Sequence, residues 1–577
     1  MKYLLDKLTD EVKRAFSDCG LQEELGLVTV SNRPDLCEFQ CNGAMSAAKR
    51  EKKNPYDIAV AVSEKLKDST AFSSVEVVKP GFLNLNVSDE LLIASLSEMN
   101  EIDDCGVSLE TPKKKIMIDY GGPNVAKPLH IGHLRSAIIG ESLKRMGRFL
   151  GNEVTGDIHL GDWGLQMGLI IAELKERNKE FPDSISELEE IYPSASEKSK
   201  QDEAFKEKAM DETYKLQHGD EANLSVWKRI MELSVADLKK NYERLNVEFD
   251  LWKGESNADP YIAPMVQKMK DEGFAVMSQG ALVIDVSEEG DSKEVPPCML
   301  LKSDGASLYT TTDLATLVER QKDYAPDQII YVVDKRQQLH FTQVFRAAKK
   351  TGIVPTETEL DFLGFGTMNG KDGKPFKTRE GGVMRLETLL DDVTGEMYKK
   401  MKENEGISLT DEEISDTAKS IALSAIKYGD LSNQASKDYI FDIDKFTSFE
   451  GNTGPYILYT MVRIKSILRK YEEKYGVTDF SAYEMKKAHS SAEKTLMLTL
   501  SAFGGMMISA FKELAPHRIC AYIYSLSNEF NRFYHETRIL TESDEEKRKG
   551  WIALLSFTLK IFSHCIRVLG MKEVERM

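Results

Sequence analysis

The alternation of apolar and polar positions divides the chain into three parts. Residues 1–110 mix helical and strand-like patterns and end near a segment, 79–86, whose apolar and polar side chains alternate as in a half-buried strand. From about residue 411 onward only helical periodicity is present, as in the stripe formed by Ile457, Met461, Ile464 and Leu468. We therefore predict an N-terminal α+β domain at 1–110, a middle domain at 111–410 and an all-α bundle at 411–577.

The middle part contains two strand–loop–helix units. Residues 115–120 predict a strand, which a glycine-proline loop and a long helix ending near Gly151 follow. The second unit has an apolar strand at 329–333, a helix at 338–350 and an apolar stretch at 360–363. Such units are typical of an α/β fold with a Rossmann-like parallel sheet. Residues 175–250 are highly charged with a helical pattern, so we expect a helical insertion there.

The composition is that of a protein with more than one folded core. The chain has 577 residues, of which 41% are hydrophobic and 29% charged. It has no run of about 18 apolar residues, so no membrane association is expected. The first residues lack the apolar core of a signal peptide, and the spacing of Leu4, Leu8 and Val12 predicts an amphipathic helix instead.

Cysteine usage and net charge restrict the possible partners. Seven cysteines are sparsely placed, and Cys37 and Cys41 have no second pair with which to form a tetrahedral zinc site. Free thiols in a reducing compartment explain them, so we expect a cytoplasmic protein without a metal centre. The formal net charge of −18 argues against a nucleic-acid partner. It does not exclude one, because affinity depends on where the basic residues lie.

The most specific chemical motif is His130-Ile131-Gly132-His133, between a predicted strand end and helix start. Helix N-termini favour anions, because unpaired N–H groups and the helix dipole converge there. Two histidines at that place can reach the phosphates of a nucleotide, and Gly132 permits close approach. The alternatives are two surface histidines or half a metal site. The position between strand and helix favours nucleotide binding.

The chain lacks a Walker P-loop. The nearest match, residues 366–371, is one residue short and continues with Asp372 where the motif needs Ser or Thr. Phosphate binding is therefore expected from the histidine motif and a lysine-rich loop at 371–379. The alternative for that loop is a solvated charged turn.

Several segments together resemble the arginyl-tRNA synthetases, a class I family. They are residues 119–136, 161–164, 307–313, 337–340, 437–442, 449–456, 530–534 and 575–577. The resemblance extends over nearly the whole chain. It implies ATP-dependent activation of L-arginine to arginyl-adenylate, followed by transfer to the terminal ribose of arginine tRNA. It also implies an N-terminal tRNA-contacting domain at 1–110, a class I catalytic domain at 111–410 and a helical anticodon-binding domain at 411–577.

The resemblance assigns the phosphate chemistry to His130, His133 and Lys127, with Gly132 as part of the ATP site. The K-M-S-K-S loop of class I synthetases is degenerate here and reads Pro375-Phe376-Lys377-Thr378-Arg379. The family's degenerate members imply that Lys127 replaces the missing lysine. The pyrophosphate contact is therefore open among Lys127, Lys377 and Arg379. Mg²⁺ is expected on the phosphates without a dedicated protein cage.

The resemblance also supplies a pocket for arginine. A guanidinium is planar and always charged, so it requires carboxylates placed as a fork. Asp119 and Asp313 are the implied carboxylates, and Tyr309 packs on the side chain. Asn124 and Gln337 hold the α-carboxylate and α-ammonium groups. For either aspartate alone, the alternative is a helix cap or a surface charge.

The expected RNA contacts lie at both ends of the chain. Phe82 and Asn84 match positions that face the tRNA elbow, although a core phenylalanine and a turn asparagine are equally compatible with the sequence. In the tail the resemblance implies Tyr456, Arg463 and Met577. The local positive charge comes from two basic groups, Arg463, Lys465, Arg469 and Lys470, then Lys560, Arg567, Lys572 and Arg576. Interleaved aromatic residues, Phe530, Phe533, Tyr534 and Trp551, are expected to stack on bases.

Two other functions fit part of the pattern. The first is a small adenylyltransferase of the H-x-G-H superfamily, which the chain length and the helical tail disfavour. The second is an inactive paralogue that only binds tRNA, which His130, His133, Asp119 and Asp313 disfavour. Pyrophosphate exchange with arginine and tRNA present distinguishes these two functions from each other and from that of a synthetase. The expected partners are arginine tRNA, L-arginine and ATP, and the chain is expected to be a monomer.

Overall fold

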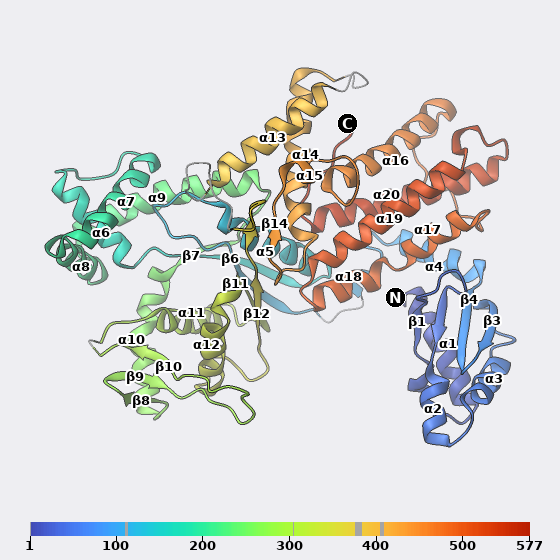
Figure 1. Cartoon of the computed structure of the whole chain (residues 1–577), viewed down its shortest axis with the longest axis horizontal. Coiled ribbons are helices and arrows are strands. Elements are labelled where there is room, and N and C mark those ends of the chain that lie inside the picture. Colours follow the sequence, from blue (N-terminus) through green and yellow to red (C-terminus); the bar gives the residue numbers. More distant parts are fainter. Residues whose placement is uncertain (1, 110–112, 304, 375–383, 404–408) are drawn as a thin grey trace.

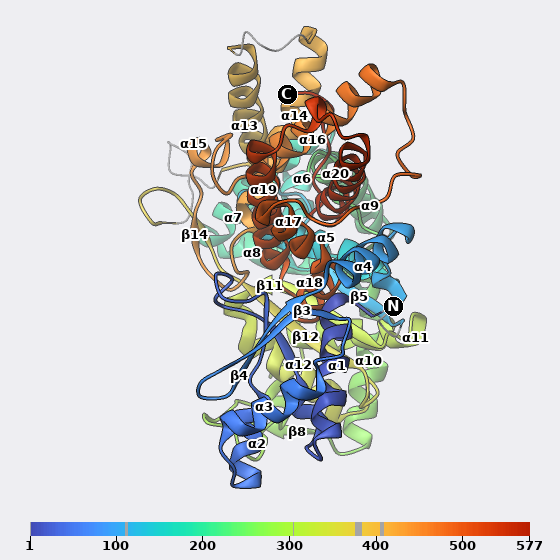
Figure 2. The ribbon, with the colours of Figure 1, turned by 90° about the vertical axis from the view of Figure 1, so that its right-hand side faces the viewer.

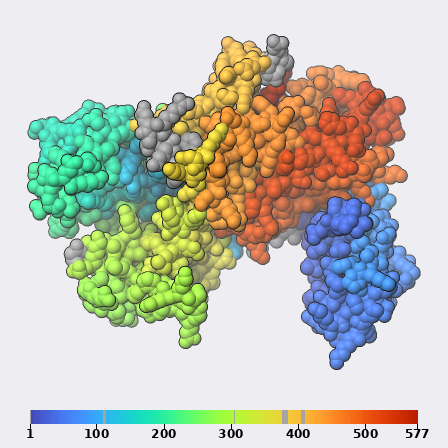
Figure 3. All heavy atoms as spheres, viewed as in Figure 1, coloured from blue at the N-terminus to red at the C-terminus, as the bar shows by residue number. Residues whose placement is uncertain are grey.

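The structure is a computed structural model that describes residues 2–109, 113–303, 305–374, 384–403 and 409–577. Figure 1 shows a central sheet with helical additions, a helical tail and a separate N-terminal domain. In Figure 3 the N-terminal domain stands away from the central part, and an open space separates the two below the tail.

The N-terminal domain combines a small antiparallel sheet with helices. Its strands, in the order β1-β2-β4-β3, are β1 (Val28–Val30), β2 (Phe39–Cys41), β3 (Phe72–Val78) and β4 (Phe82–Val87). The helices are α1 (Leu4–Asp18), η1 (Glu23–Gly26), α2 (Gly43–Glu51), α3 (Pro55–Lys65), α4 (Asp89–Glu101) and η2 (Val107–Leu109). The prediction of an amphipathic first helix is confirmed, because Leu4, Leu8 and Val12 are buried on one face of α1.

The central sheet is parallel throughout. Its strands, in the order β12-β11-β5-β6-β7, are β5 (Lys115–Tyr120), β6 (Glu153–Leu160), β7 (Leu251–Gly254), β11 (Gln328–Asp334) and β12 (Glu359–Phe365). Successive side chains point to opposite faces, so Ile118 joins one core, whereas Met117 joins the other. Both faces are covered, as expected of a parallel sheet whose strands are almost continuously apolar.

Helices cover the two faces of this sheet. They are α5 (Ile131–Phe149), α6 (Leu165–Glu176), α10 (Glu255–Asp271), α11 (Tyr309–Asp323), η3 (Lys335–Gln337) and α12 (Gln338–Lys350). Helix α5 packs on β5, β6 and β11, and residues of α10, α11 and α12 form the second core on the opposite face. The predicted strand at 115–120 and helix at 338–350 are confirmed.

Two additions project from the sheet. The first is helical, with α7 (Ile185–Gln201), α8 (Glu203–Gln217) and α9 (Glu221–Arg244), and it confirms the helical pattern of 175–250. The second is a three-stranded antiparallel sheet that the sequence analysis did not anticipate. It contains β8 (Ala275–Ser278), β9 (Ala281–Ile284) and β10 (Cys298–Leu301). Figure 1 places both additions on the side away from the N-terminal domain.

The tail is a helical bundle with one small departure. Its helices are α14 (Asp411–Leu431), α15 (Ile443–Phe446), α16 (Gly454–Tyr475), α17 (Ser491–Ser501), α18 (Phe503–Lys512), α19 (Pro516–Glu536), η4 (Ile539–Thr541) and α20 (Glu545–Val568), preceded by α13 (Leu386–Lys402). The predicted stripe on α16 is buried. The departure is β14 (Tyr439–Ile440), which pairs in parallel with β13 (Met368–Asn369) of the middle part.

Helix α20 is long and apolar enough to cross a membrane by length and composition. However, 72% of its most apolar window is buried inside the protein. Figure 2 shows α20 among the other helices of the tail. This is the property of a core helix, and it agrees with the buried Trp551, Phe557 and Phe562.

The tail also holds the N-terminal domain in place. Lys494 of α17 pairs with Glu38 at 3.0 Å, and Lys560 of α20 donates hydrogen bonds to the carbonyls of Asn100 and Ile102. These contacts attach the N-terminal domain to α17 and α20 of the tail.

Candidate active site

A cavity of about 510 Å³ lies at the carboxyl ends of β5, β6 and β11. Ligands bind at this edge in open α/β sheets, because the loops that follow the strands diverge there. The structure brings six of the candidate residues to the cavity wall: Asp119, Gly132, His133, Tyr309, Asp313 and Gln337. Three others, Asn124, Lys127 and His130, lie on the adjoining loop and do not line this cavity.

His130 and His133 form a close pair of tilted rings at the start of α5. Their ring centroids are 3.9 Å apart, and His130 is the N-cap residue of the helix. The Gly132 N–H donates to Nδ1 of His130 at 3.0 Å, and the His130 N–H donates to Nδ1 of His133 at 3.3 Å. With both Nδ1 atoms accepting, each neutral ring carries its proton on Nε2. The pair therefore offers two N–H donors to an oxygen-rich ligand.

Burial keeps these rings neutral. Burial first, and then the neighbouring His130 and Lys127, together lower the pKa of His133 to about 3. The pKa of His130 is also lowered, first by burial and then by Lys127. Neutral imidazoles donate hydrogen bonds without needing a proton from solution, so their donor function persists across the physiological pH range.

The glycine between the histidines is required by the packing of His130. A Cβ atom at Gly132 would lie 2.7 Å from Cε1 of the His130 ring, closer than real Cβ contacts. Any larger residue there would displace the ring and with it the hydrogen bond to Nδ1.

Lys127 is held against the helical insertion. Its Nζ lies 4.5 Å from the ring centroid of Tyr192 on α7, in a cation–π contact. The same helix supplies Glu189, which pairs with Arg385 at 3.0 Å. Lys127 is thus near enough to the histidines to depress their pKa values, while α7 fixes its direction.

The lysine-rich loop is only partly described. Lys371 pairs with Asp442 at 3.2 Å and Asp444 at 3.3 Å. Lys377 and Arg379 lie outside the described residues. The chain is described again at Met384, whose carbonyl accepts a hydrogen bond from the Ile131 N–H. The segment after the loop is therefore attached to the histidine motif.

Asp119 at the end of β5 is already paired with an internal guanidinium. Arg320 of α11 donates to Oδ2 of Asp119 at 2.5 Å and to Oδ2 of Asp157 at 2.6 Å. Arg320 is buried, whereas Asp119 retains some exposure towards the cavity. Only part of the Asp119 carboxylate is therefore available to a ligand, which the sequence did not indicate.

Asp313 on α11 has a histidine partner. Nε2 of His340 lies 2.5 Å from Oδ2 of Asp313, and both residues line the cavity. Tyr309, one turn earlier on the same helix, is 77% exposed at the cavity mouth. Gln337 is exposed at the end of η3. Both can therefore meet a ligand without first breaking a protein contact.

Several polar residues around this cavity had no predicted role. His159 and His340 line it, Arg320 anchors Asp119, and Glu255 begins α10 beside it. Burial raises the pKa of Glu255, and the charges of Asp162 and Asp313 raise it further. His340 lies in the segment 337–340 that carries the family resemblance, and this was the one signal in the sequence that could have revealed it.

The cavity has two electrostatic sides. His133 lines the α5 side, with His130 and Lys127 on the adjoining loop, and a phosphate would be stabilised there. Asp119, Asp313 and Glu255 lie at the other side, where a cation would be stabilised. Among the described residues there is no group of three His, Cys, Asp or Glu side chains that could hold a metal ion. The arrangement suits a reaction between a polyphosphate and a molecule with a cationic side chain.

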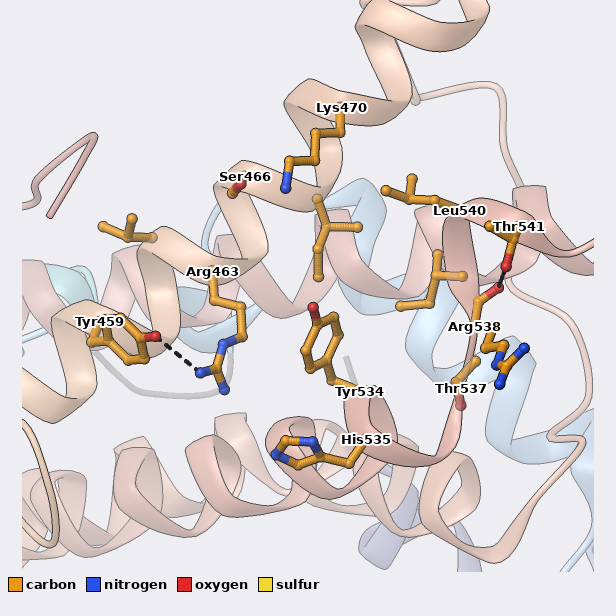
Figure 4. A pocket seen from close by; sticks show the side chains of 13 residues that line it. Tyr459, Arg463, Ser466, Lys470, Tyr534, His535, Thr537, Arg538, Leu540 and Thr541 are labelled. Atoms are coloured by element: carbon orange, nitrogen blue, oxygen red, sulfur yellow. Dashed lines mark hydrogen bonds between the residues drawn. The ribbon is translucent and has the colours of Figure 1, made fainter. Parts of the chain in front are cut away.

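A second site lies in the tail, between α16 and the end of α19. Figure 4 shows this pocket of about 560 Å³, with Arg463 between Tyr459 and Tyr534. The Arg463 guanidinium carbon lies 4.8 Å from the Tyr459 ring centroid and 5.5 Å from that of Tyr534. Lys470 and Arg538 also line the pocket. Aromatic rings beside cations are suited to an unstacked base and its phosphate.

Tyr456 lies next to this pocket in a polar network. Its hydroxyl donates to Oδ1 of Asn528 at 2.9 Å and accepts from the side-chain amide of Asn531 at 3.0 Å. Asn531 in turn accepts from Arg463 at 2.5 Å. The structure therefore brings Tyr456 and Arg463 together. Met577 is partly buried against the main core at the chain end.

Several expected base-stacking residues are in the core instead. Phe530 and Phe533 are fully buried, and Trp551 is 5% exposed, so these three cannot stack on RNA. Tyr534, at 36% exposed, is the one of the four that remains accessible. The three residues lie on the inner faces of α19 and α20, because burying their apolar rings in the core is more favourable than exposing them to water.

Some basic residues of the tail form contacts within the protein. Lys465 pairs with Glu573 at 3.0 Å and Glu575 at 2.5 Å, and only 13% of its side chain is exposed. Lys560 is bonded to backbone carbonyls of the N-terminal domain. The prediction that these two lysines face RNA is therefore not supported by their contacts.

The two N-terminal candidates lie on β4. Phe82 is half-buried at the beginning of the strand. Asn84 is 6% exposed, and its Oδ1 accepts a hydrogen bond from the Gln40 amide at 2.9 Å. Asn84 is therefore a strand residue rather than a turn residue, and Gln40 of the neighbouring strand shares its polar contact.

Comparison with known families identifies three matching segments. Residues 100–443 match the family described as tRNA synthetases class I (R), catalytic domain. Residues 457–577 match the DALR anticodon binding domain, and residues 4–87 match the arginyl tRNA synthetase N terminal domain.

Whole proteins match over the full length. The arginine–tRNA ligase of Agathobacter rectalis is 57% identical and that of Alkaliphilus oremlandii 50% identical, with 100% of each chain covered. The solved arginyl-tRNA synthetase of Plasmodium falciparum superimposes with a TM-score of 0.85 at 26% identity over 100% of both chains. That of Thermus thermophilus has a TM-score of 0.79 at 21% identity, also over 100% of both chains, which shows a shared fold.

Proposed function

The chain belongs to the arginyl-tRNA synthetase family and joins arginine to its transfer RNA with ATP as a substrate, and on this basis we propose which residues perform each step. The family also explains the division into domains. We assign residues 1–110 to tRNA contact, 111–410 to catalysis with the helical insertion near 175–250, and 411–577 to anticodon binding.

The phosphate side of the cavity binds ATP. Nε2–H of His130 and of His133 donates to phosphate oxygens, and Gly132 allows the chain to approach the nucleotide. The arginine carboxylate attacks the α-phosphate, and pyrophosphate leaves. The histidines stabilise the negative charge that shifts during this step, which is positioning and electrostatic work rather than covalent catalysis.

Lys127 is the described residue best placed to neutralise pyrophosphate. It lies close enough to both histidines to lower their pKa values. Lys377 and Arg379 remain candidates for the same contact. Mg²⁺ bound to ATP would supply further neutralisation of the phosphates, beside Lys127 and the histidine N–H donors.

The acidic side binds L-arginine. Asp313 and the free oxygen of Asp119 face the guanidinium, and Tyr309 covers the side chain. Asn124 and Gln337 hold the α-carboxylate and α-ammonium groups. The arginyl group then passes to the terminal ribose hydroxyl of the tRNA.

The RNA sites lie on the tail and the N-terminal domain. Tyr456, Arg463 and Met577 contact the anticodon region, which the pocket between Tyr459 and Tyr534 supports. Phe82 and Asn84 contact the elbow of the tRNA. The protein acts as a cytoplasmic monomer without membrane association, an assignment in keeping with its seven free cysteines.

One observation supports this assignment most strongly: His133, a neutral donor paired with His130, lines the same cavity as Asp119 and Asp313. The test is Asp313→Asn, with KM for arginine and for ATP measured by aminoacylation. We expect KM for arginine to rise about 100-fold, because the charged partner of the guanidinium is lost, with little change in KM for ATP. An unchanged KM for arginine would exclude Asp313 from the pocket.

A further inference from the structure

Asp438 of the tail has no assigned role, although it lies in the segment 437–442, which carries part of the family resemblance. Its Oδ1 atom accepts two hydrogen bonds, one from Nζ of Lys335 at 2.7 Å and one from the backbone N–H of Thr367 at 2.7 Å. Lys335 follows β11, and Thr367 follows β12. One carboxylate oxygen of the tail therefore joins the loops that leave two neighbouring strands of the central sheet.

Both loops form part of the catalytic cavity. Gln337, two residues after Lys335, lines the cavity, and so does Phe365, two residues before Thr367. Asp438 itself is not among the described residues that line it. It is therefore placed to fix residues that face a ligand without contacting the ligand itself.

The backbone around this contact is closely packed and leaves no room for added side chains. A Cβ atom at Gly366 would lie 2.5 Å from Oδ1 of Asp438, and one at Gly364 would lie 2.9 Å from Cα of Lys335. Strand β14, which begins at the next residue after Asp438, also pairs in parallel with β13. The tail segment is therefore held against both loops, and a shift of the Asp438 carboxylate would displace them.

The Asp438 carboxylate is charged in this position. The hydrogen bond from Lys335, and then that from Thr367, lower its pKa from the ordinary value. The two side chains of the ion pair are 43% exposed for Lys335 and 46% exposed for Asp438. Ion pairs with such exposure contribute little to global stability. The main effect of this contact is therefore expected on the local geometry of the two loops rather than on the stability of the fold.

We propose that Asp438 is a positioning residue for arginine: it fixes η3 against the end of β12 and thereby holds Gln337 in place for the α-groups of the substrate. The inference rests on the proposed contact of Gln337 with these α-groups. Asp438 then acts on the orientation of the arginine carboxylate, which attacks ATP, and leaves the guanidinium pocket at Asp119 and Asp313 unchanged. Such orientation matters, because a misplacement of about 1 Å can cost about 100-fold in rate.

The test compares KM for arginine with the inhibition constant of n-propylguanidine, which is the arginine side chain without its α-groups. We expect Asp438→Ala to raise KM for arginine about tenfold, because the loop that carries Gln337 loses a charged anchor. The inhibition constant of n-propylguanidine should change by less than about twofold. Asp438→Asn keeps an acceptor for the Thr367 N–H and should recover part of the loss. Equal increases in both constants would mean that the whole pocket is distorted and would overturn the proposal.

Lys335→Met removes the other partner of the ion pair. Because each single change breaks the same contact, the double variant Lys335→Met, Asp438→Asn should have a KM for arginine no higher than that of the more impaired single variant. Additive effects of the two changes would overturn the proposal. Thermal midpoints establish that the variants are folded, and Asp438→Asn and Lys335→Met decide the test if Asp438→Ala is not.

Glu359→Ala is the matched control. Glu359 begins β12 at the end of the sheet away from the cavity, and it pairs with Lys114 at 2.8 Å with a similar exposure. We expect this variant to leave KM for arginine within about twofold of the wild-type value. An increase as large as that in Asp438→Ala would show that loss of any exposed ion pair on this strand has the same effect, and would contradict a specific role for Asp438.

Gln337→Ala, measured in parallel, separates this inference from the contact on which it rests. If Gln337→Ala raises KM for arginine and Asp438→Ala does not, only the role of Asp438 is wrong. If Gln337→Ala leaves KM for arginine unchanged, the proposed contact of Gln337 with the substrate is wrong, and the role of Asp438 fails with it.

Discussion

The guanidinium of Arg135 lies 2.9 Å from the carboxylate of Asp430 in the interior of the protein. Arg135 is on α5, two residues after His133, and Asp430 is near the end of α14 in the tail. Arg135 also donates to the carbonyls of Gly366 and Lys437. The helix that begins beside His130 and His133 is thus attached to the tail by a buried ion pair.

Breaking this pair should destabilise the protein. Asp430→Asn leaves the guanidinium buried without a charged partner, so we expect the free energy of unfolding to fall by about 3 kcal/mol. Urea denaturation measures it. The double variant Arg135→Met, Asp430→Leu removes both charges and should be less destabilised than the single variant. Equal losses of unfolding free energy in the single and double variants would mean that these side chains stabilise the protein mainly by packing rather than by charge pairing.

The histidines should act on adenylate formation and not on RNA binding. We expect His133→Ala to lower the rate of arginine-dependent, tRNA-supported pyrophosphate exchange by roughly 100-fold, a typical cost of one lost donor to developing charge. The dissociation constant for tRNA, measured by filter binding, should stay within about twofold. His218→Ala, which changes an exposed histidine stacked on Tyr214, is the matched control. Wild-type exchange in a His130→Ala, His133→Ala enzyme would refute the assignment.

Much of the sheet could be predicted because its strands are short apolar runs between clear loop signals. Residues 115–120 and the helix at 338–350 match the observed bounds. The three-stranded sheet β8–β10 was missed, because its strands are only four residues long and Val276 and Met277 are exposed. Buried and exposed side chains hardly alternate in such short strands, so the sequence contains little signal for them.

The candidate site could be predicted where a motif marks it and not where partners come from distant segments. The motif located His130 and His133. Nothing in the sequence pairs Arg320 with Asp119, which are 201 positions apart, or His340 with Asp313. The aromatic residues Phe530 and Phe533 were wrongly expected at the RNA surface, because composition does not distinguish the inner face of a helix from the outer.

Stability should fall in acid through His564. This histidine donates from Nε2 to the carbonyl of Asp103 at 2.7 Å and joins the tail to the N-terminal domain. Burial, and then Arg567, lower its pKa to about 4, below the unfolded value. The unfolded state therefore binds more protons between these two values, and stability is lost as the pH falls through that window.

Through His564, the free energy of unfolding should fall by about 1 kcal/mol when the pH is lowered from about 7.5 to about 5.5. Urea denaturation of the wild type and of His564→Gln at both pH values measures it. Glutamine keeps a donor and an acceptor but does not titrate. The difference in free energy of unfolding between the two proteins should therefore change by that amount between the two pH values. A difference independent of pH would show that His564 titrates alike in both states.

The N-terminal domain should contribute to tRNA binding through Phe82. We expect Phe82→Ala to raise KM for tRNA several-fold, roughly the loss of one base-stacking contact, and to leave KM for ATP unchanged. Phe72→Ala is the matched control, because Phe72 is similarly half-buried on the neighbouring strand. If both variants raise both constants alike, Phe82 only supports the fold.

Arginine activation itself should require tRNA. By resemblance the family generally forms its adenylate only with tRNA bound, and the structure offers a physical route for such coupling. RNA bound at Arg463 on α16 acts on α14, which packs against α16, and Asp430 of α14 is paired with Arg135 on the histidine helix. RNA that binds the closed geometry more tightly shifts the population towards it.

We expect pyrophosphate exchange with arginine and ATP to rise by about 10- to 100-fold when arginine-accepting tRNA is added, the usual range of coupling between two sites. The degenerate loop at 375–379 strengthens this expectation, since a site that lacks one phosphate-binding lysine has less intrinsic tendency to close. Asp430→Asn should reduce the stimulation more than it reduces tRNA affinity, because it interrupts the connection and not the RNA surface. Robust exchange in rigorously RNA-free enzyme would refute the coupling, whereas the family assignment and the arginine pocket would stand.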